Sequence, residues 1–240
     1  MRQRSFKISW WHVAADTLQR LADFRQSYGE TDLLAFLARL MPRDAAEFVM
    51  QLYSDLHEVI NDLEESRHRL QGDGEAGLRD RVLGMLRQRG YDAEAEAQIG
   101  GHTDLLVRCR HLVLSWIGEA KVHSQYDSLV EGMKQLHTRY SNGRHQDVAL
   151  LVFVFAADAK RVIDGWKAKL IQDGTCGLIG NPASVEGWSF VTEHKHGGSG
   201  ATLRTRHIFA LLHWAPIDKS ATKSAKQLSG KRVKRAPTGG

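Results

Sequence analysis

The chain has 240 residues, of which 42% are hydrophobic and 25% charged, a composition typical of folded proteins with one large domain or two small ones. No apolar run approaches the roughly 20 residues that a membrane-spanning helix needs, and the N-terminal segment lacks the apolar stretch of a signal peptide. We therefore expect a cytoplasmic protein without a membrane partner. The two cysteines are isolated, which argues against a disulfide framework or a cysteine-based zinc site.

The formal charge of +5 is concentrated at the C-terminal end of the chain. Residues 218–240 hold seven Lys or Arg and one Asp, which leaves the preceding residues with a net charge of −1. This segment is rich in Ser, Thr, Ala and Gly, so it cannot bury enough apolar surface to fold, and we predict a disordered basic tail. The tail could bind phosphate groups without sequence preference, or it could serve solubility alone.

Residues 1–72 are predicted to form an all-helical module. Apolar side chains recur at helical spacing in three stretches. These are Trp11, Ala14, Leu18, Leu21 and Ala22; Leu33, Leu34, Leu37, Leu40 and Met41; and Val49, Leu52, Leu56, Val59, Ile60 and Leu63. Gly29 is expected to end the first helix, and Asp44 with Glu47 three residues later resembles a capping box at the start of the third. The module is slightly acidic, so we expect it to mediate oligomerisation or to bind a partner protein.

Residues 73–217 are predicted to form an α/β domain with a mixed central sheet flanked by helices. The expected elements are a helix ending at Gly90, strands over 103–108 and 112–122, a helix over about 126–140, a strand over 148–155, a helix over 162–170, and strands over 188–194 and 203–214. The run 148–155 is apolar without alternation, as in a strand buried on both faces. Strand, helix and buried strand in this order predict a parallel crossover beside an antiparallel hairpin.

Three charged residues of the predicted hairpin form a candidate catalytic cluster. Side chains alternate along a strand, so Glu119 and Lys121 share one face. Antiparallel partners have position numbers with a constant sum, and a turn near residues 111–112 places Asp104 opposite or diagonal to Glu119, with Cβ atoms about 4.5–8 Å apart. Two carboxylates this close need a cation between them, and oxygen ligands favour Mg²⁺ or Mn²⁺ over zinc. Lys121 would then lie beside a metal-bound water or a scissile phosphate, an arrangement suited to phosphodiester hydrolysis.

The same residues resemble a known family. Asp104 followed by Glu119-Ala120-Lys121 is similar to the D…(D/E)xK signature of the PD-(D/E)XK, restriction-endonuclease-like superfamily. Glu75, at the start of the preceding helix, matches an acidic residue that many members carry. Gln135 is similar to the first residue of the QxxxY element of the Mrr-like branch. The resemblance spans about residues 73–155.

The chain departs from the family pattern at two positions. Thr103 stands where the signature has proline. Tyr140 follows Gln135 by five residues instead of four, and Arg139 occupies the fourth position. The first departure is common in the superfamily, whereas the second leaves the role of Tyr140 open.

The resemblance implies a restriction-endonuclease-like fold and Mg²⁺- or Mn²⁺-dependent cleavage of nucleic acid, most often DNA, with RNA not excluded. Asp104 and Glu119 would be metal ligands, and Glu75 would complete or orient the metal shell. Lys121 would act on the attacking water, and Gln135 would position Lys121 or the phosphate. Relatives are frequent in bacterial restriction and antiviral defence and are commonly dimers, which suggests a homo-oligomeric defence effector by analogy.

Several of these assignments have simpler alternatives. Glu75 could simply compensate the dipole of its helix, and Gln135 could be a surface residue. His102 and His123 could line the cleft, although surface histidines without a special role are more common. The alternative function is a non-catalytic protein that keeps the nuclease fold and binds nucleic acid or a protein. Intact Asp104, Glu119 and Lys121 favour the nuclease.

Overall fold

The computed structural model describes residues 18–20, 22–23, 25–27, 29–95, 97–98, 101–141 and 146–218. Residues 18–20, 22–23 and 25–27 are helical, in agreement with the first predicted helix, but Trp11, Ala14 and Leu21 lie outside the described residues. The predicted basic tail also lies outside them, except for Asp218. Among the described residues, no helix has both the length and the apolar character needed to cross a bilayer.

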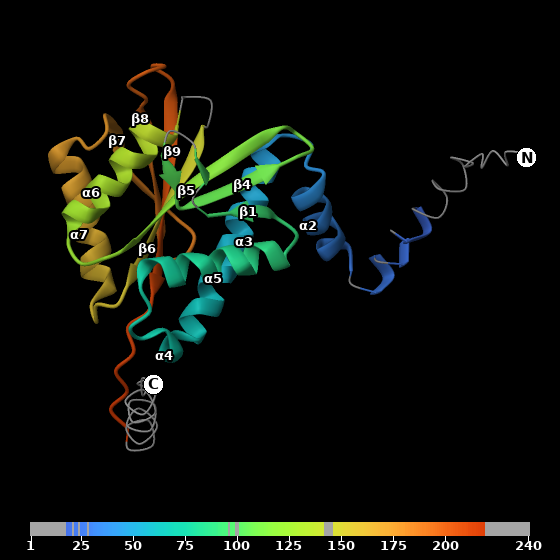
Figure 1. The fold of residues 1–240 in the computed structure, drawn as a ribbon, viewed down its shortest axis with the longest axis horizontal. Helices are drawn as coiled ribbons and strands as arrows, with labels where there is room; N and C mark the ends of the chain where they lie inside the picture. Colours follow the sequence, from blue (N-terminus) through green and yellow to red (C-terminus); the bar gives the residue numbers. More distant parts are fainter. Residues whose placement is uncertain are drawn as a thin grey trace, which may run out of the picture.

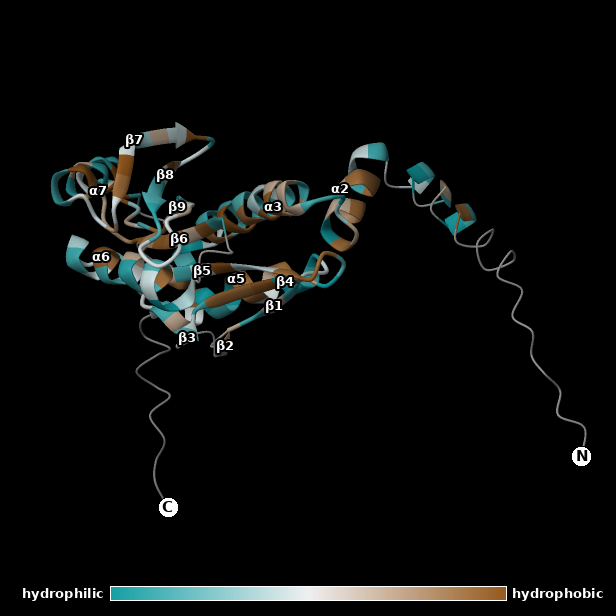
Figure 2. Ribbon diagram, turned by 90° about the horizontal axis from the view of Figure 1, so that it is seen from above, coloured by the Kyte–Doolittle hydropathy of each residue, from teal (hydrophilic) through white to brown (hydrophobic). Residues whose placement is uncertain are grey.

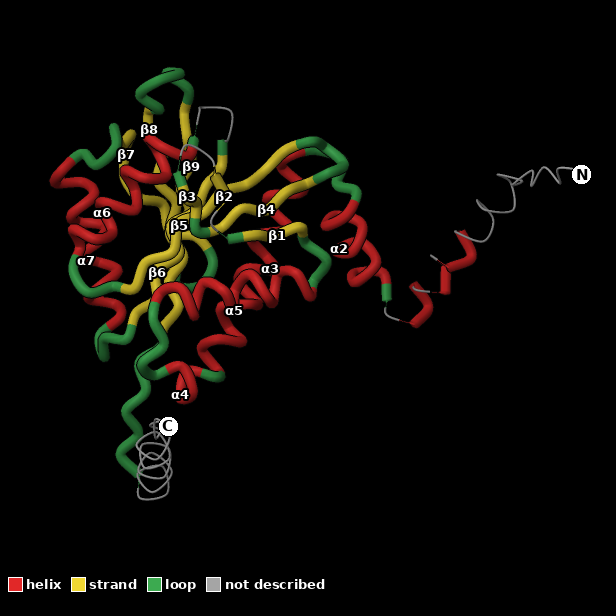
Figure 3. The backbone as a smooth tube through the Cα atoms, in the orientation of Figure 1, coloured by secondary structure: helices red, strands yellow, loops and turns green. Residues whose placement is uncertain are grey.

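A seven-stranded mixed sheet, in the order β1-β4-β5-β6-β9-β8-β7, forms the centre of the molecule (Figures 1 and 3). Its strands are β1 (Asp92–Glu94), β4 (Leu105–Cys109), β5 (Leu114–Val122), β6 (Asp147–Val154), β7 (Leu178–Val185), β8 (Ser189–Lys195) and β9 (Thr202–Leu211). Strands β5, β6 and β9 are parallel to one another, and the remaining pairs are antiparallel. Two shorter strands, β2 (Ala97–Gln98) and β3 (His102–Thr103), form a separate ribbon. The predicted α/β class and mixed sheet are confirmed.

Helices cover both faces of the sheet (Figure 3). They are α2 (Glu30–Leu40), α3 (Ala45–Glu65), α4 (Arg67–Leu70), α5 (Glu75–Gln88), α6 (Tyr126–Lys134), the π-helix η1 (Gln135–Tyr140) and α7 (Ala159–Asp173). One face packs against α3 and α5, the other against α6, η1 and α7. Segment α6–η1 connects the parallel strands β5 and β6, as the predicted crossover requires.

Helix α3 shares its core with the sheet. Its residues Leu52, Leu56 and Leu63 are buried in one apolar cluster with residues of α5, β4, β5, β6 and β9. The hydroxyl of Tyr53 donates to the carbonyl of Val148 over 3.1 Å. The apolar core is therefore continuous across residue 72, and the division into two domains predicted there stays a prediction.

Several helix ends lie where the sequence signals predict them, whereas the strands β1, β2 and β7 were not predicted. Asp44 caps α3 by accepting a hydrogen bond from the Glu47 amide at 2.8 Å, as the capping signal predicts. Gly90 has φ +95° just after α5, which confirms the predicted helix end. Strand β7 was not predicted because Gly180 and Pro182 interrupt its pattern, and proline is tolerated at the edge of a sheet.

Candidate active site

The hairpin of β4 and β5 has the register that brings Asp104 and Glu119 together. Leu105 pairs with Gly118, so the next position outward on each strand is Asp104 and Glu119, which confirms the predicted placement. The backbone amide of Ala120 donates to Oδ2 of Asp104 over 3.0 Å. Asp104 is thereby attached to the strand that carries Glu119.

The ammonium of Lys121 lies among three carboxylates. Its Nζ is 2.7 Å from Oε1 of Glu119, 3.4 Å from Oε1 of Glu75 and 3.8 Å from Oδ2 of Asp104. The side chain of Lys121 is only 17% exposed. Four of the five predicted site residues therefore meet at one place, near the carboxyl end of β5.

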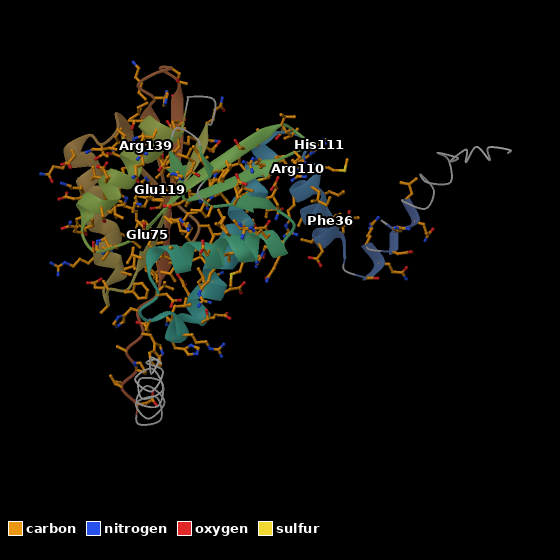
Figure 4. All side chains as sticks on the ribbon, in the orientation of Figure 1. Phe36, Glu75, Arg110, His111, Glu119 and Arg139 are labelled. Atoms are coloured by element: carbon orange, nitrogen blue, oxygen red, sulfur yellow. The ribbon has the colours of Figure 1, made fainter. Side chains whose placement is uncertain are left out.

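Glu75 joins the start of α5 to the end of β5. Its Oε2 accepts a hydrogen bond from the backbone amide of Val122 over 3.0 Å, while Oε1 faces Lys121. Helix α5 begins at Glu75, so the carboxylate also lies where the helix dipole favours negative charge. The two interpretations of Glu75 are thus compatible. Figure 4 shows Glu75 and Glu119 close to where α5 meets β5, with Arg110 and His111 well away at the hairpin tip.

Glu119 is the most deeply buried acid of the cluster, at 2% exposure. Its Oε2 has no hydrogen-bond partner within the described part of the chain. Burial raises the pKa of Glu119 to about 7, and the charge of Asp104 adds to the rise, while Lys121 opposes it. Lys121 therefore does not fully compensate the negative charge of this carboxylate.

Lys121 stays charged in spite of its burial. Burial alone would lower the pKa of its ammonium, but the hydrogen bond to Glu119 and the charges of Glu119, Glu75 and Asp104 outweigh it and raise the pKa. The aliphatic part of Lys121 packs closely on α6: a Cβ added at Gly132 would lie 3.2 Å from Cγ of Lys121. The glycine thus allows the helix to approach the lysine.

Gln135 begins η1, on the helical segment that packs against β5. Its Oε1 is buried, and no hydrogen-bond partner for it is found among the described residues. The structure does not join Gln135 to the charged cluster by a hydrogen bond through Oε1, so its predicted role stays a prediction.

The π-helix η1 extends from Gln135 to Tyr140. A π-helical turn closes between residues i and i+5 instead of i and i+4, and such turns are frequent at functional sites. Tyr140 stands five residues after Gln135 and ends η1. Its hydroxyl donates to the carbonyl of His102 over 2.6 Å, so η1 is tied to the segment that leads into Asp104.

Sequence analysis did not single out Arg79. The residue lies on α5 and is buried at 9% exposure. Its Nη1 is 3.4 Å from Oδ1 of Asp104. Arg79 follows Glu75 by four residues, a spacing that places both on one helix face and could have pointed to it.

The donor set fits a divalent cation only in part. In the described residues, no group of three or more His, Cys, Asp or Glu side chains is already arranged to hold a metal ion. Instead, three carboxylates surround the ammonium of Lys121. The unpartnered Oε2 of Glu119 beside Asp104 is nevertheless suited to a hard cation, which prefers carboxylate oxygens. Asp104 and Glu119 are therefore the residues that would hold Mg²⁺ or Mn²⁺.

Comparison with family models, with curated proteins and with solved structures gives no match to this chain. Membership in the PD-(D/E)XK superfamily and a restriction-endonuclease-like fold therefore remain predictions drawn from the residues themselves. The proposed function therefore rests on the geometry of the cluster.

A second polar cluster, buried between α7, η1 and strands β8 and β9, contains histidines that sequence analysis did not single out. Trp166 Nε1 donates to Nδ1 of His207 over 3.1 Å, and Nε2 of His207 lies 2.8 Å from the hydroxyl of Thr192. That hydroxyl lies 2.6 Å from Nε2 of His194, whose Nδ1 lies 3.1 Å from the carbonyl of Thr175. Every contact is satisfied if both histidines are neutral, so this is a network of the core.

Of the two histidines expected near the cleft, His102 is exposed and His123 is half-buried. Nε2 of His123 is buried and has no hydrogen-bond partner in the residues described. Burial lowers the pKa of His123, so its ring is neutral at physiological pH.

Proposed function

We propose that this protein is a metal-dependent nuclease that hydrolyses phosphodiester bonds, with DNA as the preferred substrate. One observation carries the proposal: Asp104 and Glu119 meet across a hairpin, and Lys121 reaches both from the same strand end. A partly buried cluster of three acids and one lysine, with Glu119 fully enclosed, is costly to the fold, and such costs are typical of functional sites.

Each residue of the cluster has its own proposed role. Asp104 and Glu119 would hold the divalent cation, which when bound lowers the pKa of water and offsets charge on the phosphate. Glu75 fixes the end of β5 through the Val122 amide and orients Lys121 by an ion pair. Lys121, held in its charged form, orients the attacking water or binds a phosphate oxygen. Gln135 lies on the helical segment that packs against β5, and it would support Lys121 or the phosphate.

The wider setting is proposed by analogy alone. By the resemblance to restriction-endonuclease-like proteins, we propose a role as an effector of bacterial defence or restriction that acts in the cytoplasm as a homo-oligomer. The exposed apolar residues of α2 and α3 support self-association or a protein partner at the N-terminal helices. Among the exposed apolar residues here are Leu34 and Leu40 on α2, Met41 just after it, and Met50 on α3. Figure 2 shows hydrophobic stretches along both helices.

Cleavage of supercoiled plasmid by the purified protein, with Mg²⁺ and with Mn²⁺, tests this function. The wild type is expected to nick or linearise the plasmid, and Asp104→Ala and Lys121→Ala are expected to lose activity by about a hundredfold or more. Glu131→Ala, an exposed acid on α6, is the matched control and should cut like the wild type. Equal cleavage by all four proteins would assign the activity to another site or a contaminant.

A second substrate separates DNA from RNA. A labelled single-stranded RNA is incubated under the same conditions as the plasmid. Cleavage of RNA but not of plasmid would show that the substrate is RNA, and the proposed active site would stand. No cleavage of either substrate, with either metal, would favour the alternative of a non-catalytic binding protein.

A further inference from the structure

Arg79 is a charged side chain of the site to which the proposed function assigns no task. It lies one turn after Glu75 on α5, so the helix directs a carboxylate and a guanidinium toward the same strand ends. Its side chain is only 11% exposed. Nη1 lies 3.4 Å from Oδ1 of Asp104, and Nη2 lies 3.1 Å from Oδ1 of Asp80.

Asp104 is held from two sides as a result. The amide of Ala120 donates to Oδ2, and Arg79 faces Oδ1. A guanidinium cannot give up its proton in a protein, and its burial is costly unless it is paired with an acid. Arg79 therefore keeps a carboxylate beside it, and this restricts the orientation of Asp104.

The ion pair of Arg79 with Asp80 lies toward the solvent. The side chain of Asp80 is 61% exposed, so water screens this pair and its contribution to stability is small. Within the charged cluster, the carboxylate that Arg79 faces is that of Asp104.

Arg79 also sets the charge of the cluster. Glu75, Asp104 and Glu119 carry three negative charges when ionised, and Lys121 and Arg79 carry two positive ones. One net negative charge remains, and removal of Arg79 would double it. The affinity for a divalent cation held by Asp104 would depend on this net charge, because charges interact strongly in partly buried sites.

We propose that Arg79 is a positioning residue that orients Asp104 and limits the affinity of the site for a divalent cation. This inference rests on the proposed function, since it concerns the same cluster. Without Arg79, the cation binds more tightly but Asp104 holds it in more than one orientation. A residue with a merely structural role would lower stability without tightening metal binding.

Calorimetric titration of the full chain with Mn²⁺ at pH 8 tests the inference, alongside plasmid cleavage. Arg79→Gln is expected to bind Mn²⁺ about threefold to tenfold more tightly than the wild type, while its turnover falls about tenfold or more. Arg79→Lys keeps the charge, so its affinity is expected to stay within about twofold of the wild type while turnover falls. Arg81→Gln is the matched control: it removes the same charge from the same helix at a side chain paired with Asp73, and should change neither quantity.

The outcomes distinguish this inference from the function on which it rests. A wild type that binds no Mn²⁺ contradicts the proposed function and the inference together. A wild type that binds Mn²⁺, with a folded Arg79→Gln of equal or weaker affinity, overturns the inference alone. If circular dichroism shows that Arg79→Gln does not fold, Arg79→Lys decides: lowered turnover at unchanged affinity supports the inference, and unchanged turnover overturns it.

Discussion

Glu119 links the chemistry of the site to the stability of the fold. Its carboxyl group is buried, and its pKa rises from 4.5 to about 7. An acid whose pKa is higher in the folded than in the unfolded chain holds its proton more tightly when folded. The metal-free protein therefore loses stability as the pH rises from about 4.5 to about 7.

Glu119→Gln is accordingly expected to stabilise the metal-free protein at pH 8, by about 1–3 kcal/mol, because it removes a buried charge that is not fully compensated. At pH 5 the wild-type side chain is protonated and the gain should nearly vanish. Denaturant unfolding at both pH values measures the difference. Glu131→Gln, on an exposed side chain, serves as control, and a gain of the same size at both pH values would contradict the assigned pKa.

At the scale of single residues, the sequence was most informative about the hairpin. The register of Asp104 and Glu119 follows from the length of the turn, and Lys121 follows from strand alternation. The spacing from Glu75 could have placed Arg79 on the same helix face, but its contact with Asp104 depends on the distance between α5 and the residues before β4, which no local pattern encodes. Gln135 falls between these cases, since its helix was predicted but the direction of its side chain was not.

At the scale of elements, the approach of α6 to β5 depends on Gly132. A Cβ at this position would lie 3.2 Å from Lys121 Cγ and 3.2 Å from Leu150 Cδ1, so a side chain there would require these neighbours to shift. The helix was predicted from its apolar periodicity. The close approach was not, because periodicity shows which side of a helix is buried but not the distance to its neighbour.

Gly132→Val is therefore expected to displace Lys121 and lower plasmid cleavage about tenfold or more, at a cost of about 1–3 kcal/mol in stability. Gly84→Ala on α5 is the control, because a Cβ there meets nothing within 4 Å and alanine favours a helix. Activity close to wild type in a folded Gly132→Val would show that the position of Lys121 does not depend on this contact.

The strands β8 and β9 carry the buried histidine network, and His137 of η1 packs against it with its ring centroid 4.5 Å from that of His194. Burial lowers the pKa of His137 to about 3 and that of His194 to about 4, and neighbouring histidines add to the effect at His137. In the unfolded chain these rings take up a proton near pH 6.5, whereas the folded protein resists it. Their stabilising contribution is therefore complete above pH 6.5 and is lost as the pH falls toward 4 and below.

His194→Gln removes one of these titrations and should make the fall in stability between pH 6.5 and pH 4.5 shallower than in the wild type. Unfolding free energies across this range provide the measurement. His111→Gln, at an exposed position on the hairpin tip, should leave the slope unchanged. Identical slopes for all three proteins would mean that His194 is not held neutral by the fold.

At the scale of the whole molecule, the N-terminal helices and the sheet are joined by a buried ionic contact. Arg39 on α2 pairs with Asp55 on α3 at 2.6 Å, and Tyr91, just after α5, donates to the same carboxylate over 2.5 Å. Asp55 is fully buried. The sequence predicted helices here from their spacing, but it could not reveal this contact, because the partners are far apart in the chain.

Asp55→Ala is expected to lower the free energy of unfolding by about 2–4 kcal/mol, since it leaves Arg39 and Tyr91 without their shared acceptor. Asp62→Ala, on the exposed side of the same helix, should cost far less. Denaturant unfolding would show the contrast. Loss of stability confined to an early transition for Asp55→Ala would indicate that α2 and α3 unfold separately from the sheet.

The central claim is that Asp104 and Glu119 together bind the divalent cation of a nuclease. Anomalous X-ray diffraction from crystals grown with Mn²⁺ tests it most directly. The account predicts a strong manganese peak within bonding distance of carboxylate oxygens of both residues, with Lys121 beside it, and no such peak in crystals of Asp104→Ala. Wild-type crystals with no peak at this position, or with manganese bound only elsewhere on the protein, would contradict the account.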